Sequence, residues 1–367
     1  MSDGVLLEAS ADRRDGELKV PTRPEEVTAE WLTAALARRI PGAVVHELEA
    51  LERIHGASSK LRLRLRLNAA AEAAGVTRQV ILKAGFENHS PGLEVMHRNE
   101  VNAYRHLAPS ADVPTAACFY ADCDSTGRAV VVLEDLTLRN VEFLSLQRPI
   151  SYALAERFLD HLAKLHARWW NAPDLAAQTW VLPSHGEYRR ARVEALLAPA
   201  SYEAFVNAPR GAATPQALKD PDLIRRCFFR LGEHYARMPQ LIVHGDMHLG
   251  NLFVFADGEP GVLDWQPRLA TWSNDVTYFL VGGLDLPDRR RWEQPLLNHY
   301  LDQLRALGVD APSFDEAWLA HRRDVMWGFY VWLFNGFTYQ SESNNTAACT
   351  RFATAMIDHD TVAALLG

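Results

Sequence analysis

The octapeptide HGDMHLGN, residues 244–251, is the stretch of this 367-residue chain that most specifically indicates its fold. An apolar run, Leu241–Val243, precedes it, and a second apolar run, Leu252–Phe255, follows it. Turn residues at 257–261 then lead to a third apolar run that ends at Asp264. Short apolar runs separated by turns that contain Gly and Asp are typical of a strand, a loop and a β-hairpin. The sequence therefore predicts polar side chains gathered at the ends of buried strands.

Two polar residues of this loop, Asp246 and Asn251, have the spacing D-x-x-x-x-N. This spacing is typical of a kinase catalytic loop, where the aspartate orients the attacking hydroxyl and the asparagine offers a neutral oxygen to a metal ion. Asp264 stands thirteen residues after Asn251, across the predicted hairpin, where its carboxylate can reach the same metal. Mg²⁺ prefers such oxygen ligands and shares the rest of its shell with phosphate and water. The pattern predicts Asp246 as the catalytic base and Asn251 and Asp264 as metal ligands.

Two other interpretations of this stretch stay open. Aspartate and asparagine are common in turns, so the polar residues can be ordinary turn residues. His244, Asp246 and His248 also alternate, and two histidines with a carboxylate can bind zinc in a hydrolase. Gly245 and Gly250 favour a loop over a continued strand, and the sequence has no further cluster of His and Asp to complete such a site. The combination of spacing and flanking strands favours the kinase interpretation.

A lysine and a glutamate nearer the N-terminus form a second candidate pair. Lys83 lies in the apolar run VILKA, residues 80–84, where an unpaired ammonium would be costly. Glu100 lies on a predicted helix at 93–107, on the face where the helical spacing also places apolar residues. The pattern predicts that the two side chains meet, as they do in kinases to hold the lysine against nucleotide phosphates. A strand-end lysine and a surface glutamate are the alternative.

The turn HGASSK, residues 55–60, joins two strand-like runs. Gly56, Ser58 and Ser59 suit a loop that folds over phosphates with backbone N–H groups and hydroxyls. The turn has one glycine and lacks the pattern G-x-G-x-x-G, so by itself it is better explained as an ordinary hairpin turn.

The whole chain divides into a strand-rich first third and a helical remainder, which predicts an α+β fold of two lobes. The predicted parts are a polar lead-in at 1–27, an N-terminal nucleotide-binding lobe at 28–135, and a larger, mostly helical catalytic and substrate-binding lobe at 136–367. The small lobe is expected to hold one inserted helix at 93–107, after a first helix capped by Thr28, and a surface connection at 69–75. Its antiparallel sheet is predicted from strand-like runs at 44–54, 61–67, 80–84, 113–120 and 129–133.

Two helix starts in the larger lobe carry recognisable caps. Ser151 can cap an amphipathic helix that extends to residue 170, and the sequence SFDE at 313–316 is a capping box.

Composition and charge narrow the function classes. The chain has 38 Lys and Arg against 46 Asp and Glu, a net charge of −8 without blocks of like charge, which argues against a nucleic-acid partner. The four cysteines are scattered, so we expect reduced thiols in a cytoplasmic protein. The sequence has no signal-type or membrane-spanning apolar run, so no membrane partner is expected. No protein partner is evident either.

Four strings of the sequence resemble the aminoglycoside phosphotransferase and choline kinase group of kinase-like enzymes, and within it most closely the ecdysteroid-kinase-like (CHK kinase-like) branch. They are VVLEDL at 131–136, LAKLHA at 162–167, VHGD at 243–246 with Asn251, and VLDWQ at 262–266. The likeness extends over about residues 40–340. It implies a bilobal kinase fold, ATP or GTP as the phosphoryl donor, and Mg²⁺.

The resemblance also implies roles for individual residues. It makes Lys83 the phosphate anchor, Glu100 its partner, and the segment from Glu134 to Leu136 the hinge whose backbone meets the purine. His166 and His244 match structural histidines of the family. A further residue, Asp275, is expected either to cap the following helix or to steady the catalytic loop.

The predicted acceptor is a small molecule with a hydroxyl group. Asp264 is followed by Trp-Gln-Pro instead of Phe-Gly, and no Ala-Pro-Glu segment follows, so a protein substrate is not expected. Acids after residue 267 are interspersed with arginines, so no strongly acidic patch for an aminoglycoside is evident. A few of the late aromatic residues, most of which are expected in the core, would suit a rather apolar alcohol; they are Trp318, Trp327, Phe329, Trp332 and Phe337. An aminoglycoside-type antibiotic phosphotransferase and a catalytically silent, kinase-like nucleotide-binding protein are the alternatives.

Overall fold

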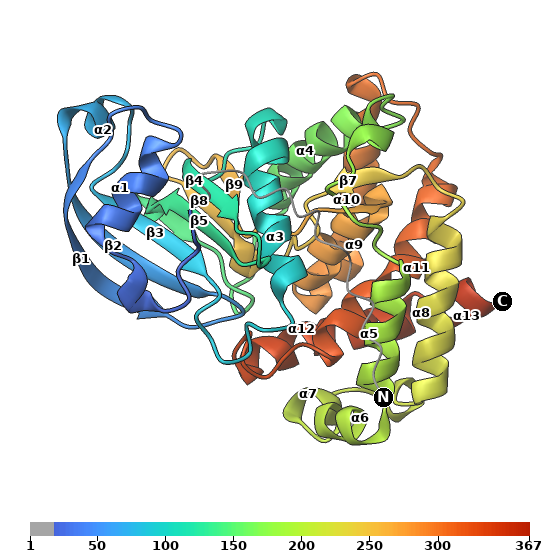
Figure 1. Cartoon of the computed structure of the whole chain (residues 1–367). Helices are drawn as coiled ribbons and strands as arrows, with labels where there is room; N and C mark the ends of the chain where they lie inside the picture. The colour runs from blue at the N-terminus through green and yellow to red at the C-terminus, as the bar shows by residue number, and fades with distance from the viewer. Residues whose placement is uncertain (1–17) are drawn as a thin grey trace. The chain divides into compact units, whose positions relative to one another are not determined.

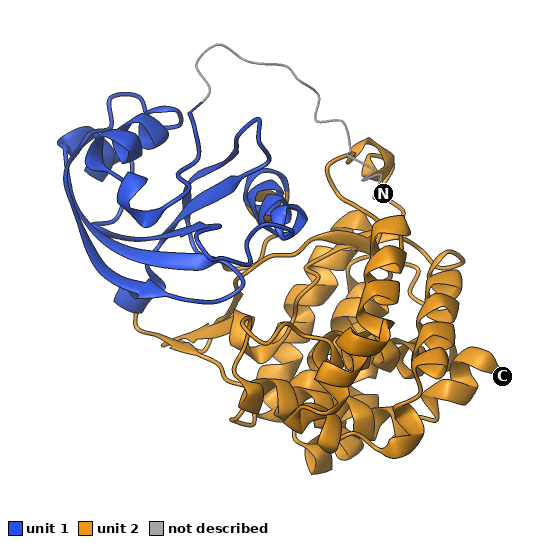
Figure 2. Ribbon diagram, turned by 60° about the horizontal axis from the view of Figure 1, so that its bottom comes forward, with its two compact units in different colours: residues 1–106, 116–139 blue, residues 107–115, 140–367 orange. Residues whose placement is uncertain are grey.

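The computed structural model describes residues 18–367 and is shown in Figure 1. Residues 1–17 of the predicted lead-in lie outside the described part of the chain. The described chain forms two compact units, which Figure 2 colours separately. Unit 1 comprises the described residues up to 106 together with 116–139, and unit 2 comprises 107–115 and 140–367. The assignment of nucleotide binding to the first part and catalysis to the second stays a prediction.

Unit 1 contains a five-stranded sheet in the order β1-β2-β3-β5-β4. Its strands are β1 (Val45–Ile54), β2 (Ser59–Leu67), β3 (Gln79–Ala84), β4 (Cys118–Cys123) and β5 (Ala129–Glu134). Every pair of neighbouring strands is antiparallel. The predicted small antiparallel sheet is therefore confirmed.

The alternation of leucine and arginine in β2 determines which face of the sheet is buried. The four leucines of β2 are 1–9% exposed and belong to the core of unit 1. The three arginines between them form ion pairs with Glu52, Glu49 and Glu47 on the neighbouring strand β1. Period-two alternation thus fixes the register, because a slip by one residue would bury the arginines.

The helices of unit 1 are α1 (Ala29–Ala37), α2 (Ala69–Ala73) and α3 (Glu94–Asn102), which continues into a π-helical turn (Ala103–Leu107). Thr28 caps α1 as predicted, because its side chain accepts a hydrogen bond from the backbone N–H of Trp31. Residues 69–75, expected to form a surface connection, instead contain α2. The side chain of Asn68 caps this helix by accepting from the N–H of Ala71.

Two further expectations for unit 1 are wrong in detail. The fourth strand begins at Cys118 and not at residue 113, because the preceding segment belongs to unit 2, where the Pro114 carbonyl accepts a hydrogen bond from the N–H of Val262 (2.9 Å). The described end of the lead-in also packs into unit 1. Val20 and Val27 are buried, and the Val20 N–H donates to the carboxylate of Asp124 (3.2 Å).

Unit 2 is mostly helical, as predicted, and contains two small sheets. Its helices are α4 (Tyr152–Trp169), α5 (Glu187–Leu197), α6 (Pro199–Val206), α7 (Pro209–Ala212), α8 (Pro221–Tyr235), α9 (Trp272–Gly283), α10 (Leu286–Ala306), α11 (Phe314–Leu333), α12 (Glu342–Asp358) and α13 (Thr361–Leu366). Its strands are β6 (Val141–Phe143), β7 (Leu241–Val243), β8 (Leu252–Phe255), β9 (Pro260–Val262) and β10 (Arg268–Ala270). Strand β7 pairs with β10, and β8 lies between β6 and β9.

The core of unit 2 is built around α9, all twelve residues of which are buried. Helix α11 packs against α9 and α12, and α10 packs against α4. The predicted caps are confirmed: Ser151 accepts from the N–H of Leu154, and Ser313 and Glu316 form a reciprocal capping box. Between residues 18 and 367, no helix combines the length and apolar character that a membrane crossing requires.

Candidate active site

The predicted catalytic loop follows β7, whose three residues are fully buried. The Asn251 side chain binds Asp246 twice, because Nδ2 donates to the Asp246 carbonyl oxygen (3.0 Å) and to Asp246 Oδ2 (2.9 Å). His248 Nδ1 accepts from the N–H of Gly250 (3.0 Å), and its Nε2 lies 3.7 Å from Asp246 Oδ2. The Asp246 side chain keeps 32% of its surface exposed, so the carboxylate is both positioned and accessible.

Glycine at position 245 is required by the backbone path of this loop. Gly245 has φ +88°, and a Cβ there would lie 1.9 Å from the carbonyl oxygen of Gln266. The Gln266 N–H in turn donates to the His244 carbonyl (2.9 Å). Because no other residue combines this φ with such a close approach, the loop and the segment after Asp264 are held together only with glycine at this position.

The β8–β9 hairpin brings Asp264 beside Asn251. The Leu263 N–H donates to the Asn251 carbonyl (2.8 Å), and His244 Nε2 binds the Leu263 carbonyl (3.1 Å). Asp264 itself has φ 53°, in the left-handed region that non-glycine residues seldom adopt and that is often found at functional sites. The hairpin therefore brings together the two residues predicted to bind metal.

The donor set at this place fits Mg²⁺. Asp246 occupies the Nδ2 end of the Asn251 amide, which leaves Oδ1 as the neutral oxygen. With the carboxylate of Asp264, the two side chains would supply hard oxygen ligands and leave the rest of a magnesium shell to phosphate and water.

Asp275 steadies the catalytic loop, which decides between the two roles expected for it. Its carboxylate accepts from the backbone N–H groups of His244 (2.6 Å) and Gly245 (2.9 Å). The same carboxylate contacts His166 Nε2 (3.3 Å), and His166 Nδ1 contacts the Tyr300 hydroxyl (2.7 Å). Burial alone would raise the pKa of Asp275, but hydrogen bonding and the charge of His166 lower it below its usual value. The carboxylate is therefore ionised and fully engaged.

The zinc interpretation of this loop does not fit the hydrogen bonds. Both ring nitrogens of His244 are engaged, Nε2 with the Leu263 carbonyl and Nδ1 with the N–H of Asp246 (3.2 Å). His248 uses Nδ1 for the Gly250 N–H. Residues 244–248 do not supply a set of metal-binding atoms among the described residues.

The predicted pair of Lys83 and Glu100 is present within unit 1. Lys83 Nζ lies 2.5 Å from Glu100 Oε1, and the two side chains are 5% and 6% exposed. A small pocket beside them is lined by Ser58 and His97 as well as by the pair itself. A lysine and a glutamate are tolerated in a buried position when they pair with one another, so we interpret this ion pair as part of the pocket's structure.

The three residues predicted to bind phosphate in the turn at 55–60 have different surroundings in the structure. Ser58 lines the pocket next to Lys83, whereas the Ser59 side chain is buried and its hydroxyl binds the carboxylate of Glu87. The carbonyl of Gly56 contacts His89 Nε2 (2.9 Å). The role of this turn in phosphate binding stays a prediction, with Ser58 as the hydroxyl nearest the lysine pocket.

The predicted hinge lies at the end of β5. The backbone N–H of Glu134 donates to the Ala117 carbonyl (2.8 Å), and its carboxylate accepts from the Ala117 N–H (3.3 Å). Asp135 binds Arg62 Nε (2.9 Å), and Leu136 is buried at the start of a 3₁₀ turn. Contact of this segment with a purine stays a prediction.

Sequence reasoning missed Tyr278, an aromatic neighbour of Asp246. Tyr278 on α9 hydrogen-bonds to Asp246, and burial followed by this acidic neighbour raises the pKa of Tyr278 well above its usual value. Trp332 stacks on Tyr278 (centroids 6.3 Å apart) and contacts the edge of His248 (5.3 Å). Phe337, another of the late aromatic residues named from the sequence, lies beyond the end of α11 and is 52% exposed. Tyr278 gave no local signal because α9 is buried on all sides.

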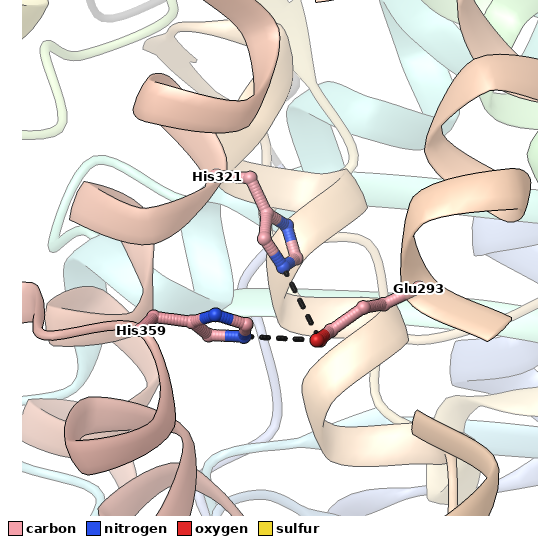
Figure 3. A group of neighbouring side chains, drawn as sticks. All are labelled: Glu293, His321 and His359. Carbon is pink, nitrogen blue, oxygen red and sulfur yellow. Dashed lines mark hydrogen bonds and ion pairs between the residues drawn. The ribbon is translucent and has the colours of Figure 1, made fainter. Parts of the chain in front are cut away.

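A second cluster of potential metal ligands lies elsewhere in unit 2. Figure 3 shows one oxygen of the Glu293 carboxylate joined to the imidazoles of both His321 and His359; the ring nitrogens lie 3.7 Å and 3.0 Å from this oxygen. Arg289 Nη1 lies 2.9 Å from the same Glu293 oxygen and 3.0 Å from His359 Nε2. The guanidinium therefore already supplies the positive charge, and we interpret the cluster as a buried ion-pair network that joins α10, α11 and the end of α12.

Comparison with known proteins assigns the family and the fold. A family described as "Phosphotransferase enzyme family" matches residues 75–308. No curated protein matches the chain significantly in sequence.

Solved structures of kinases resemble the chain at low identity. A GDP and kanamycin complex of the aminoglycoside phosphotransferase APH(2″)-IIIa has a TM-score of 0.51 at 12% identity, with 89% of this chain and 98% of that chain covered. An ethanolamine kinase from Plasmodium vivax has a TM-score of 0.50 at 11% identity, with 86% and 84% covered. Identities this low show the fold alone. The α+β, protein-kinase-like fold predicted from the sequence is confirmed.

Proposed function

The chain belongs to the phosphotransferase enzyme family, and from this premise we propose that it is an ATP-dependent kinase that phosphorylates a hydroxyl group of a small molecule. The observation that carries the proposal is the arrangement of Asp246, Asn251 and Asp264 around one loop and hairpin. GTP is a second candidate for the donor. Within the family we place the chain nearest the CHK kinase-like branch, on the sequence strings that resemble it.

The chemistry proposed for unit 2 is in-line phosphoryl transfer. The acceptor oxygen forms a bond to the γ-phosphorus while the bond from that phosphorus to the bridging oxygen breaks, ADP departs, and the hydroxyl proton passes to Asp246. Asn251 holds the Asp246 carboxylate in place through Nδ2 (2.9 Å). Bound Mg²⁺, held by Asn251 and Asp264, would neutralise charge that develops on the phosphate oxygens.

In unit 1, the proposed role of Lys83 is to neutralise phosphate charge. Glu100 pairs with the ammonium and keeps it in position.

The acceptor is proposed to have an apolar body. Tyr278, which hydrogen-bonds to Asp246, and Trp332, which stacks on Tyr278, support this, because aromatic side chains near a site favour apolar or aromatic ligands. A cytoplasmic location stays a prediction from the cysteines, all four of which are free thiols in the structure.

The test is a screen of hydroxyl-bearing metabolites for acceptor-dependent release of ADP, with ATP and GTP compared as donors. We expect turnover with at least one apolar alcohol, loss of turnover with a magnesium chelator, and loss in Asp246→Ala. An exposed turn residue of the same hairpin, Asp257, provides the control Asp257→Asn, which should retain activity. Nucleotide binding without any transfer to a broad panel would favour the silent binding protein, and efficient phosphorylation of several aminoglycosides would favour an antibiotic phosphotransferase.

A further inference from the structure

Arg268 lies directly beside the catalytic loop. It begins β10 and pairs with Val243, the last residue before that loop. Its Nη1 is 3.2 Å from the position that a Cβ on Gly245 would occupy. Its Nε and Nη2 donate to the neutral side-chain oxygen of Asn274 (3.2 and 3.0 Å). A guanidinium is therefore fixed next to the residue that precedes Asp246.

A second guanidinium shares an aromatic neighbour with Arg268. Arg268 Cζ lies 4.3 Å from the centroid of the Trp327 ring, and Arg189 Cζ lies 5.2 Å from it. Helix α5, which carries Arg189, is tied to β10 through the chain that precedes it: the Ser184 N–H donates to the Leu269 carbonyl (2.8 Å), and the Leu269 N–H donates to the Leu182 carbonyl (2.9 Å). The two cations are thus brought together by backbone structure as well as by the indole.

Neither cation is in an ion pair with a carboxylate in the described part of the chain. Within residues 18–367, Arg189 and Arg268 form no ion pair at 4.0 Å or less, although most other arginines in this range do. Asp324 lies near Arg268, but burial raises its pKa to about 7, so it carries only part of a negative charge at neutral pH. The carboxylate of Asp275 is engaged by the loop backbone. Asp246 is therefore the accessible anion of this neighbourhood, and it is the proposed base.

Two partly desolvated cations near one another repel, and this repulsion disfavours the charged form of Arg268. Burial, followed by the charge of Arg189, lowers the pKa of Arg268 to about 10, although the charges of Asp275 and Asp246 offset part of the effect. An arrangement of this kind is unfavourable in the free protein and becomes favourable when an anion binds. The planar guanidinium suits carboxylate and phosphate groups because it can donate two parallel hydrogen bonds.

We infer that the acceptor carries an anionic group, a carboxylate or a phosphate, that Arg268 and Arg189 bind while its hydroxyl group faces Asp246. This inference rests on the proposed kinase function and names the substrate class: an apolar, hydroxylated acid. The aromatic side chains Trp327, Tyr278 and Trp332 would contact its body. A cationic acceptor, such as an amino sugar or an amino alcohol, would be repelled by the same two arginines.

The binding test uses simple probes and does not depend on turnover. Benzoate, phenyl phosphate and benzylammonium are titrated calorimetrically into the wild type and into Arg268→Gln, Arg189→Gln and Arg190→Gln. Arg190 is the matched control, because it lies next to Arg189 on α5, is exposed and stacks instead on Phe229 (4.8 Å). We expect one or both anions to bind the wild type, about tenfold or more weaker binding to the first two variants, and unchanged binding to the control. Comparison of the two anions distinguishes a carboxylate site from a phosphate site.

A loss of binding must be separated from a loss of folding. Each variant is therefore compared with the wild type by thermal unfolding, and Arg268→Lys, which keeps the charge but not the two-pronged geometry, should bind anions with intermediate affinity. The inference is overturned if neither anion binds the wild type, if benzylammonium binds better than benzoate, or if the control loses as much affinity as the other variants. Anion binding without any phosphoryl transfer would refute the kinase function and leave the anion site. Transfer to cationic alcohols without anion binding would refute the anion site and leave the kinase function.

Discussion

The carboxylate of Asp275, on α9, accepts a hydrogen bond from the backbone N–H of Gly245 at 2.9 Å. This contact connects the most buried helix of unit 2 to the residue before the proposed catalytic base. Because Gly245 also lies against the carbonyl of Gln266, its position fixes the loop on two sides. The accuracy with which Asp246 is placed therefore depends on a carboxylate that takes no part in the chemistry.

The first prediction concerns this positioning role. Asp275→Asn should lower turnover by about tenfold or more and destabilise the protein by about 1–3 kcal/mol, because an amide can accept only one of the two backbone hydrogen bonds and turns a donor towards the other N–H. Thermal unfolding and acceptor-dependent release of ADP measure the two effects. An exposed aspartate on α10, Asp302, gives the control Asp302→Asn, which should change neither (side chain 71% exposed). Normal turnover in Asp275→Asn would show that the loop is held without this residue.

The second prediction separates the base from the metal ligand. Asp246→Ala should remove most phosphoryl transfer and leave nucleotide affinity largely unchanged, because its carboxylate binds Asn251 and its proposed role is to accept the proton of the acceptor hydroxyl. Asp264→Ala should also weaken the binding of magnesium-nucleotide, which can be measured by titration at several magnesium concentrations. Near-normal turnover of the true substrate by Asp246→Ala would refute the assignment of the base.

Sequence patterns predicted the features of the fold that depend on residues close together in the chain, such as helix caps and the buried face of a strand. Ser313 and Glu316 stand three residues apart and form the expected capping box, and the alternation in β2 identified its buried face. Lys83 and Glu100 are 17 positions apart, but each was identifiable as a charged residue on an apolar face, and two such residues need one another.

Contacts between distant helices could not be predicted in the same way. Glu293, His321 and His359 come from three elements, and Arg289 joins them only because α10 packs against α11. Each of these residues by itself is an ordinary polar residue, either on a helix or at the end of one. Tyr278 was missed for a different reason, since α9 is buried throughout and its sequence has no polar face that would mark the side towards Asp246.

The third prediction concerns the buried pair in unit 1. Lys83→Met removes the cation that pairs with the Glu100 carboxylate, and Glu100→Leu removes the carboxylate that pairs with the ammonium, so each single variant should lose about 3–5 kcal/mol of stability and much of its nucleotide affinity. The double variant should lose far less than the sum of the two, because neither buried charge remains. Thermal unfolding and nucleotide titration of all four proteins complete the cycle. Additive losses would mean that the two residues do not interact in solution.

The last prediction concerns pH and Asp324 on α11. Its carboxylate is 2% exposed and hydrogen-bonds to the hydroxyls of Tyr235 and Ser273. Burial raises its pKa to about 7 from 3.8, although these hydrogen bonds oppose the rise. Between these two pH values the folded protein binds a proton that the unfolded chain has lost, so the free energy of unfolding should fall as pH increases through this window. The full shift corresponds to about 4 kcal/mol.

Asp324→Asn should remove this dependence, because an amide has nearly the shape of the acid and no charge to bury. At pH 8 the variant should be more stable than the wild type by up to about 4 kcal/mol, and near pH 4 the two should be similar. Thermal and urea unfolding at pH 4 to 8 measure the difference, with Asp310→Asn, an exposed residue of the loop before α11, as the control that should follow the wild type at every pH. A variant that is less stable than the wild type at pH 8 would mean that the Asp324 carboxylate is ionised in the folded protein and stabilised by Arg268. In that case Arg268 would have an anionic partner in the free protein, and the site would have less need of an anionic acceptor.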